Sequence, residues 1–375
     1  MQMHNEIKTA LTRAKLYVQK QYRPNGAYSL QLNSPPTLLS MAFGGLADLM
    51  LANDPSLDTV GRVLACRDAS GRFVDTVLTR IEIDSTLHPY DYLADQTHYF
   101  AVRFLRCASN NCDSVAAPIE FSDQNPVDWI NSLNWGDAWL ESNRVMFALE
   151  LLPARCDKRL ALLDWLENNW DEKTGYWGTD RGSTLLRGMA GAFHFLGFLL
   201  EAGYRLPDAE TVLQSTLSLQ HGDGSFAPNG GGNTCLDMDA IDILCLYWPV
   251  LQGDLRNRVT LALQNAAKAC LSLQKPDGGF PESFSAAARS RQVELGTLDP
   301  NQLGQTWRGA QIIRYSSWGR MEYDATQSDL WSTMSRVASL LRIVQTFDET
   351  NAMGLIPDIP GAGIAQFVQT NKVRL

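Results

Sequence analysis

LSLQHGDGSF, residues 217–226, returns further along the chain as LSLQKPDGGF, residues 271–280. The two stretches share a leucine, a glutamine, an Asp-Gly pair and a final phenylalanine in the same register. A phrase repeated at this spacing is typical of one supersecondary unit copied several times. The repeat therefore predicts a modular architecture, and the other copies of the phrase indicate how many units the chain holds.

Further copies of a glycine next to an aromatic residue occur along the chain, with Asn134-Trp135-Gly136 as the weakest of them. The glycines recur about every fifty residues, at Gly26, Gly71, Gly136, Gly175, Gly224 and Gly278. Glycine relieves the steric cost of a tight or left-handed turn, and an aspartate before it bonds its own backbone. We expect the aromatic ring to be buried between repeats and the glutamine to satisfy turn amides or a free helix end.

The segments between these turns have helical periodicity of two kinds. Residues 157–170 and 254–274 carry an apolar stripe opposite charged residues, as in helices with one wet face. Residues 36–52, 184–200 and 241–251 are apolar nearly all round, which predicts buried helices. β-branched alternation is scarce, so we expect no sheet. Alternation of the two kinds predicts an all-α fold, an (α/α)6 toroid with six inner and six outer helices.

The predicted toroid occupies residues 1–350 as a single domain, followed by a C-terminal tail at 351–375. Within it, residues 281–324 interrupt the rhythm of the repeats between the last turn and the last inner helix. Insertions of this length often form lids or binding loops. Residues 281–324 are therefore predicted to be either a lid or a surface excursion.

Composition argues against several classes of function. A net charge of −9 disfavours nucleic-acid binding, because such a surface repels phosphate backbones. We expect neither a signal peptide nor a transmembrane segment, since no long uninterrupted apolar window occurs. The seven cysteines are dispersed without a CxxC pair, as expected for reduced thiols in a cytoplasmic protein. We predict no metal and no cofactor, and the sequence leaves the oligomeric state open.

The QxxDGSF and QxxDGGF phrases resemble the QW-type repeat of the superfamily that contains squalene-hopene cyclases and protein-prenyltransferase β-subunits. This resemblance implies an α-toroid fold. Class II terpene cyclases of this superfamily use a DxDD motif, whose middle aspartate protonates an alkene or an epoxide. The matching letters here are DMDA, so Asp237 and Asp239 fill the first and middle positions while Ala240 replaces the last aspartate.

The residues around DMDA support an acid role on their own chemistry. Asp239 and Asp242 are three residues apart and share a helix face, and Asp237 lies near the start of the helix. Close carboxylates raise one another's proton affinity, and one of them can then act as a general acid. The alternative is that these three aspartates serve as helix caps and buried hydrogen-bonding groups.

A second cluster combines acids with a histidine and a tyrosine. Asp91, Asp95, His98 and Tyr99 recur at helical spacing, which allows acid–base chemistry by Asp95 and His98 and substrate contacts by Asp91 and Tyr99. A lone helical histidine is also common as a satisfied core residue. The resemblance to prenyltransferases would give His98 a zinc-ligand role, but the Asp-x-Cys pair of that family is missing, which disfavours zinc.

The remaining candidates are an arginine, an acid and a set of aromatic rings. Arg144 could clamp a carboxylate or phosphate, or pair with Glu141 instead. Asp329 could face Asp239 across the cavity as a second catalytic acid. Aromatic walls stabilise carbocations and also stack on sugars, although buried aromatic stripes are more often plain core. The candidate aromatic substrate contacts are Trp135, Trp139, Trp307, Tyr323 and Trp331.

Three functional hypotheses follow. The first is a terpenoid-cyclase-like enzyme, a cyclase or isomerase, in which Asp239 protonates a small isoprenoid. The second is a carbohydrate-active toroid, a glycoside hydrolase, uronate lyase or epimerase, in which Asp95 or Asp239 is the acid, Asp329 is its partner and Arg144 holds a uronate of the saccharide. The third is a toroid that binds a peptide or lipid without catalysis, because fold does not fix function.

Overall fold

The structure is a computed structural model. It describes residues 2–51, 57–75, 90–109, 124–227, 234–282, 312–313, 323–324 and 327–347. Trp307, most of the predicted insertion 281–324 and the whole tail 351–375 lie outside the described residues. The domain limits, and the lid role of the insertion, therefore stay predictions.

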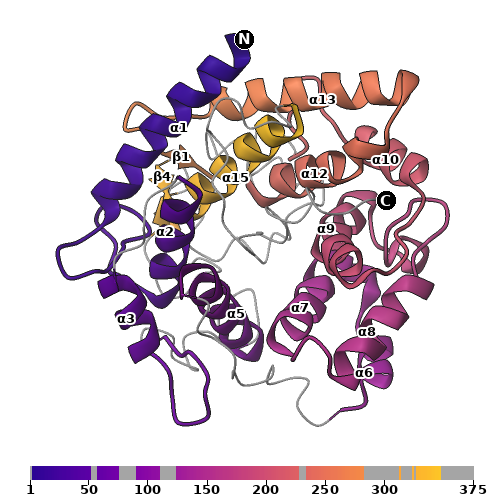
Figure 1. The fold of residues 1–375 in the computed structure, drawn as a ribbon, viewed down its shortest axis with the longest axis horizontal. Helices are drawn as coiled ribbons and strands as arrows, with labels where there is room; N and C mark the ends of the chain where they lie inside the picture. The colour runs from indigo at the N-terminus through magenta and orange to yellow at the C-terminus, as the bar shows by residue number, and fades with distance from the viewer. Residues whose placement is uncertain are drawn as a thin grey trace.

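Six helices form a closed inner ring (Figure 1). Each inner helix packs against the next one along the chain, and the last packs against the first. In chain order they are α2 (Leu38–Met50), α5 (Tyr90–Ser109), α7 (Ala138–Leu151), α9 (Leu185–Ala202), α12 (Thr234–Tyr247) and α15 (Leu330–Phe347).

Six outer helices surround this ring, and each one precedes an inner helix in the sequence (Figure 1). The first of them packs on the last, so the outer layer also joins its two ends. They are α1 (Gln2–Gln21), α3 (Leu57–Ala65), α6 (Pro126–Ser132), α8 (Asp157–Asn168), α10 (Ala209–Leu217) and α13 (Gly253–Ser272). The predicted toroid with six inner and six outer helices is confirmed.

Shorter elements complete the described chain. Three 3-10 helices are η2 (Trp135–Asp137), η3 (Thr179–Arg181) and η4 (Trp248–Val250). Two antiparallel pairs of two-residue strands join β1 (Phe280–Pro281) to β4 (Ser328–Asp329) and β2 (Ile312–Ile313) to β3 (Tyr323–Asp324). The expectation of no sheet is wrong at these pairs. The predicted helix 241–251 also begins earlier than expected, at Thr234.

Inner helix α9 shows how an apolar sequence becomes a core helix. It starts after Thr184, whose side chain accepts a hydrogen bond from the amide of Arg187, and ends at Gly203 in the left-handed conformation. By length and composition alone α9 could cross a membrane, and 67 % of its apolar window is buried inside the molecule. Its place in the inner ring accounts for its apolar character.

The predicted turns are confirmed at five of the six glycines. These five have φ between 74° and 95°, a region that favours glycine, at Gly26, Gly71, Gly175, Gly224 and Gly278. The sixth prediction is wrong, because Gly136 lies in η2 without a positive φ. Only the short stretch between α6 and α7 is available there, and it leaves no room for the longer turn.

The repeated glutamine joins each turn to the next outer helix. Gln220 donates from Nε2 to the carbonyl oxygens of Gly224 (2.9 Å) and Ala262 (2.8 Å). Gln274 donates in the same way to Gly278 and Ala10, both at 2.8 Å. The glutamine therefore satisfies a turn carbonyl and a carbonyl within the next outer helix, whereas turn amides or a free helix end were expected. Those amides are served by the aspartate, since Asp223 Oδ1 accepts from the amide of Ser225 at 2.9 Å.

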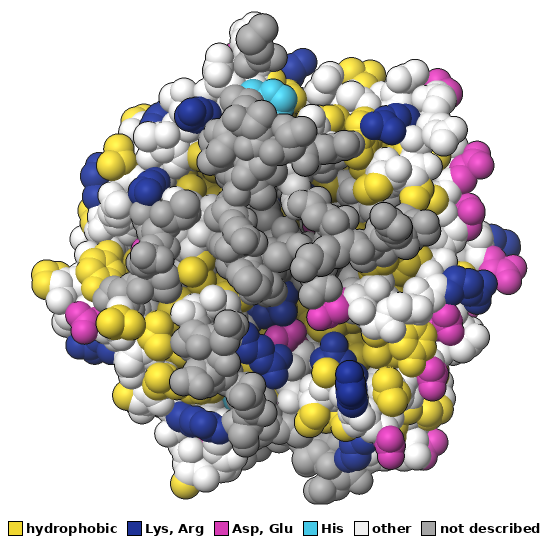
Figure 2. All heavy atoms as spheres, viewed as in Figure 1, with side chains coloured by type: hydrophobic (Ala, Val, Ile, Leu, Met, Phe, Trp, Pro, Cys, Tyr) yellow, Lys and Arg dark blue, Asp and Glu magenta, His cyan; other side chains and the backbone are white. Residues whose placement is uncertain are grey.

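The described surface mixes charges of both signs. Around the rim in Figure 2, dark-blue lysines and arginines lie among magenta carboxylates, with yellow hydrophobic side chains between them. In this view most of the magenta carboxylates lie along the right-hand rim, and dark-blue side chains occur on both sides.

Candidate active site

Asp237 links the repeated turn to the inner ring. Its Oδ1 accepts hydrogen bonds from the amides of Phe226 (2.7 Å) and Ala227 (2.8 Å), and its Oδ2 lies 3.0 Å from Nη1 of Arg336. The buried Arg336 comes from the neighbouring helix α15. Two amides and one guanidinium thus share the two oxygens of this carboxylate. Asp237 therefore fastens three segments together.

Asp242 is the second paired carboxylate of α12. Its Oδ1 accepts from Nε of Arg342 on α15 at 2.8 Å, and Arg342 also donates to Gln345. Burial raises the pKa of Asp242, and the nearby Arg342 lowers it in part. Arg336 thus pairs with Asp237 and Arg342 with Asp242, so the two acids on either side of Asp239 both have a cationic partner.

Asp239 differs from both neighbours. Its side chain is 1 % exposed, and neither carboxylate oxygen has a hydrogen-bond partner among the residues that the structure describes. Burial, followed by the charges of Asp242 and Asp237, raises its pKa well above the usual range. An isolated carboxylate inside a protein takes up a proton to avoid the cost of a buried charge. Burial and the two neighbouring charges therefore favour the protonated, neutral form of Asp239.

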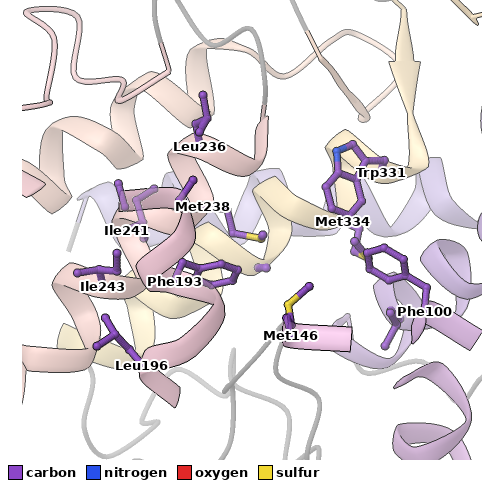
Figure 3. Packing of buried hydrophobic residues seen from close by; sticks show 14 of the residues in the cluster. Phe100, Met146, Phe193, Leu196, Leu236, Met238, Ile241, Ile243, Trp331 and Met334 are labelled. Atoms are coloured by element: carbon purple, nitrogen blue, oxygen red, sulfur yellow. The ribbon is translucent and has the colours of Figure 1, made fainter. Parts of the chain in front are cut away.

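Large apolar side chains face one another across the centre of the ring beside this acid. Figure 3 shows Phe193 and Met238 directed toward the side chains of the opposite helices, with Met146 between the two groups. We call this set the central lining: Phe100, Met146, Phe193, Met238, Trp331 and Met334. Met238 immediately precedes Asp239 on α12, so the acid is carried by one of the helices that supply the central lining. Aromatic rings and thioethers offer apolar, polarisable contacts without competing charges.

The Asp95 and His98 side chains bind the second turn. Asp95 forms a salt bridge with Arg72, and His98 accepts at Nδ1 from the amide of Phe73 at 3.1 Å. Thr333 makes the corresponding contact to the amide of Phe280 in the last repeat, at 3.0 Å. This position of the inner helices therefore has a repeated structural use, and a catalytic role for Asp95 or His98 stays a prediction.

The other members of the two middle clusters are dispersed. Asp91 is half-buried at the start of α5, and Tyr99 packs on Phe147 with ring centroids 5.2 Å apart. Trp135 stacks on Trp165 at 5.2 Å and donates from Nε1 to a backbone carbonyl, so it belongs to the packing between layers. Trp139 is half-buried in the first turn of α7.

Arg144 forms the ion pair that was the alternative to an anion clamp. Its Nη1 lies 3.4 Å from Oε2 of Glu141. Both side chains border a pocket of about 480 Å³ between α6 and α7, whose lining is Gln124, Trp129, Ser132, Leu133, Asn134, Glu141 and Arg144. The pocket has polar groups of both signs, and the clamp stays a prediction.

The last cluster divides between capping and lining. Asp329 caps α15, because its Oδ1 accepts from the amide of Ser332 at 2.7 Å and its Oδ2 from the hydroxyl of the same residue. It lies on the helix next to α12 and not across the ring from Asp239. Trp331 joins the central lining and packs on Phe43 at 5.0 Å. For Tyr323 only the backbone is described, in β3.

Sequence reasoning missed both arginines of α15. A usable signal was present, since Arg336 and Arg342 lie in an otherwise apolar helical stretch. Arginine is almost never fully buried unless it is paired, so two of them predict two buried carboxylates. The identity of those partners depends on which helix packs beside α15.

Thiols and metal ligands add no further site to the described chain. Within the part that the structure describes, six cysteines are free thiols, and no group of three or more His, Cys, Asp or Glu side chains is placed to hold a metal ion. Burial raises the pKa of Cys235, one turn before Asp239, well above its usual value, with the charge of Asp239 as a further cause.

Comparison with known proteins identifies the fold. No protein-family model and no curated protein matches the chain. Solved structures of the type II terpene cyclase MstE from Scytonema do match. A variant in complex with geranylgeranyl dihydroxybenzoate has a TM-score of 0.52 at 12 % identity and covers 92 % of this chain and 99 % of that one. Apo MstE has a TM-score of 0.50 at 13 % identity and covers 91 % and 98 %. The chain therefore shares the toroid fold of a type II terpene cyclase over nearly its whole length.

Proposed function

We propose that the protein is a terpenoid-cyclase-like enzyme that cyclises or rearranges a small isoprenoid by general acid catalysis. The observation that carries this proposal is Asp239, a buried carboxylic acid without a hydrogen-bond partner in the described chain, on the inner helix α12 that also supplies Met238 to the central lining. It occupies the middle position of the DMDA segment, where class II cyclases have their proton donor.

The proposed reaction starts with transfer of the Asp239 proton to a carbon–carbon double bond. The π electrons form the new C–H bond, which leaves a carbocation on the substrate and a carboxylate on Asp239. Another double bond of the same chain attacks the cation and closes a ring. Loss of a proton from the final cation to water gives a neutral product, and the Asp239 carboxylate takes a proton back from water, so the overall change is an isomerisation.

The neighbours of Asp239 have supporting roles in this scheme. Asp237 and Asp242 are held by Arg336 and Arg342, and their negative charges keep the proton on Asp239 in the resting enzyme. Once the proton has left, the same two charges lie near the developing carbocation and favour it electrostatically. Asp242 thereby provides the second carboxylate that Ala240 lacks.

The central lining supports an isoprenoid substrate better than a saccharide. Phe100, Phe193 and Trp331 offer π faces to a cation, and the methionines offer soft apolar surface. The MstE structure that was solved with geranylgeranyl dihydroxybenzoate, a prenylated substrate, adds weight to this reading.

The test is product formation from linear polyprenyl compounds of ten to twenty carbons, with and without an aromatic head group, followed by gas chromatography and mass spectrometry. We expect cyclised isomers from the native protein. Asp239→Asn should reduce their formation by about 10²–10⁴-fold, the usual contribution of a general acid. Asp254→Asn, the same change at an exposed position of α13, is the matched control and should keep full activity. Full activity in Asp239→Asn would refute the proposal.

A further inference from the structure

Two adjacent side chains of α5 are buried without serving the fold. Gln96 is 6 % exposed and its Oε1 has no hydrogen-bond partner in the described chain, and Thr97 is 1 % exposed with Oγ1 in the same condition. Leaving such a group unpaired costs about 1–3 kcal/mol, so buried polar groups are nearly always bonded. Two of them in sequence therefore need an explanation outside the packing of the protein itself.

Helix geometry directs both groups toward the centre of the ring. Gln96 and Thr97 precede Phe100 by four and three residues. They therefore lie one turn earlier on the face of α5 that carries Phe100, one on each side of it. Figure 3 shows Phe100 as part of the central lining. In the six-membered ring, α5 lies three helices from α12 in either direction, so this face is opposite the helix that carries Asp239.

The pair has the hydrogen-bonding pattern of a receptor for a hydroxyl group. The amide of Gln96 offers an acceptor and a donor, and the hydroxyl of Thr97 can donate or accept. A bound hydroxyl can donate to Gln96 Oε1 while it accepts from Thr97, so both orphaned atoms are satisfied at once. A hydrocarbon satisfies neither of them, and an ether or ketone oxygen cannot donate to Oε1.

We infer that Gln96 and Thr97 bind a hydroxyl group of the substrate across the ring from Asp239, so that the substrate is an isoprenoid alcohol or phenol and not a plain hydrocarbon. This inference rests on the proposed function and adds a specificity determinant to it. The hydroxyl fixes one end of the chain against α5 and orients the rest of it along the central lining toward α12.

The test measures binding, which does not require turnover. Calorimetric titration of the native protein compares farnesol and a farnesyl-substituted phenol with farnesene, which has the same carbon chain as farnesol without the hydroxyl. We expect at least one hydroxylated ligand to bind about tenfold or more tightly than farnesene. The ligand with the larger preference distinguishes an alcohol from a phenol as the source of the hydroxyl.

Two variants test whether the side chains of Gln96 and Thr97 cause the preference for hydroxylated ligands. Gln96→Leu and Thr97→Val should each reduce it by about tenfold while farnesene binding changes little. Gln21→Leu is the matched control, because Gln21 is equally buried with an unpartnered Oε1 but lies on the outer helix α1. It should keep the full preference. Circular dichroism confirms that each variant is folded before titration.

The outcomes separate this inference from the function on which it rests. Equal binding of hydroxylated and hydroxyl-free ligands to the native protein overturns the inference and indicates that the pair binds water only, while the proposed cyclase function stands. A preference that survives both Gln96→Leu and Thr97→Val also overturns it. Failure of all three isoprenoids to bind overturns the proposed function together with the inference.

Discussion

Three aspartates of one helix have three different environments. Asp237 is bonded by two backbone amides and Arg336, Asp242 is bonded by Arg342, and Asp239 has no partner in the described chain. The residue type is the same throughout, so the environment alone decides which of them keeps a proton. This division of roles resembles other acid–base sites, where neighbouring carboxyl groups are set apart by burial and charge.

The raised pKa of Asp239 predicts how stability depends on pH. Below the unfolded-state pKa of about 3.9 the residue is protonated in both states and has no effect. Above it, the unfolded chain releases the proton while the folded one retains it, so this residue destabilises the fold increasingly with pH. The unfolding free energy of Asp239→Asn minus that of the native protein should therefore rise from pH 4 to pH 7, with a limiting slope of about 1.4 kcal/mol per pH unit. Urea denaturation at several pH values measures it.

Asp68 provides a control of opposite sign. It is exposed in the second turn, where the hydroxyl of Ser70 and the amides of Arg72 and Ser70 lower its pKa. Its carboxylate contributes its full stabilisation above the unfolded-state pKa of about 3.9 and loses it as pH falls through the lower folded-state pKa. The relative stability of Asp68→Asn should therefore fall slightly as pH rises to about 4 and stay constant from pH 4 to pH 7. A pH-independent difference for Asp239→Asn would show that Asp239 ionises normally in the folded protein, which removes the basis for its acid role.

At the residue scale, the sequence was informative about the acid and silent about its surroundings. The DMDA letters and the i, i+3 spacing were enough to single out Asp239 and Asp242. The partners Arg336 and Arg342 lie about a hundred residues away, and only the packing of α15 on α12 brings them close. Gln96 and Thr97 were passed over because a polar residue in a helix carries no sign of whether its hydrogen bonds are made.

Among the elements, the turn after each outer helix has the strictest geometry. In the last repeat, Gly278 has a φ of 95°, and a Cβ built there would lie 2.3 Å from the carbonyl oxygen of Arg13 on α1. Backbone strain and a steric conflict therefore coincide at one residue. Elsewhere, Gly182 has almost the same φ, 94°, with nothing within 4 Å of such a Cβ.

This pair of glycines separates the two costs experimentally. Gly182→Ala should lose about 1–2 kcal/mol of unfolding free energy, the cost of a left-handed residue with a side chain. Gly278→Ala should lose clearly more, by a further 1–3 kcal/mol, because α1 or the turn must move to relieve the contact. Chemical denaturation of both variants measures the difference. Equal losses would mean that the turn and α1 are not in close contact.

The elements themselves were largely predictable, because each one leaves a local pattern. Helices α8, α9 and α13 begin and end within a few residues of the predicted limits, since amphipathic or fully apolar periodicity is written in consecutive residues. The turn predicted at Gly136 was wrong because it was inferred from the glycine and tryptophan letters alone, without regard to the length of chain that such a turn needs. The two-residue strands were missed for a different reason, because they depend on pairing between separate segments of the chain.

On the scale of the whole molecule, the repeats have to close on themselves. The six-fold count followed from the spacing of the turns, and a ring is the arrangement in which six buried helices each find two inner neighbours. The same pairing that holds consecutive repeats also joins the last to the first, as α15 packs on α2 and α13 on α1 (Figure 1). Closure leaves no inner helix with an exposed flank.

The two repeated glutamines allow closure to be tested. Gln220→Leu and Gln274→Leu each remove two hydrogen bonds of similar length to a turn glycine and to the next outer helix, which is α13 in the first case and α1 in the second. Each should cost about 1–3 kcal/mol. In hydrogen exchange, Gln274→Leu should speed the amides of α1 and spare the junction of α10 with α13, and Gln220→Leu should do the opposite. If both variants loosen α1 alike, the first helix is a frayed end and not a closing member of the ring.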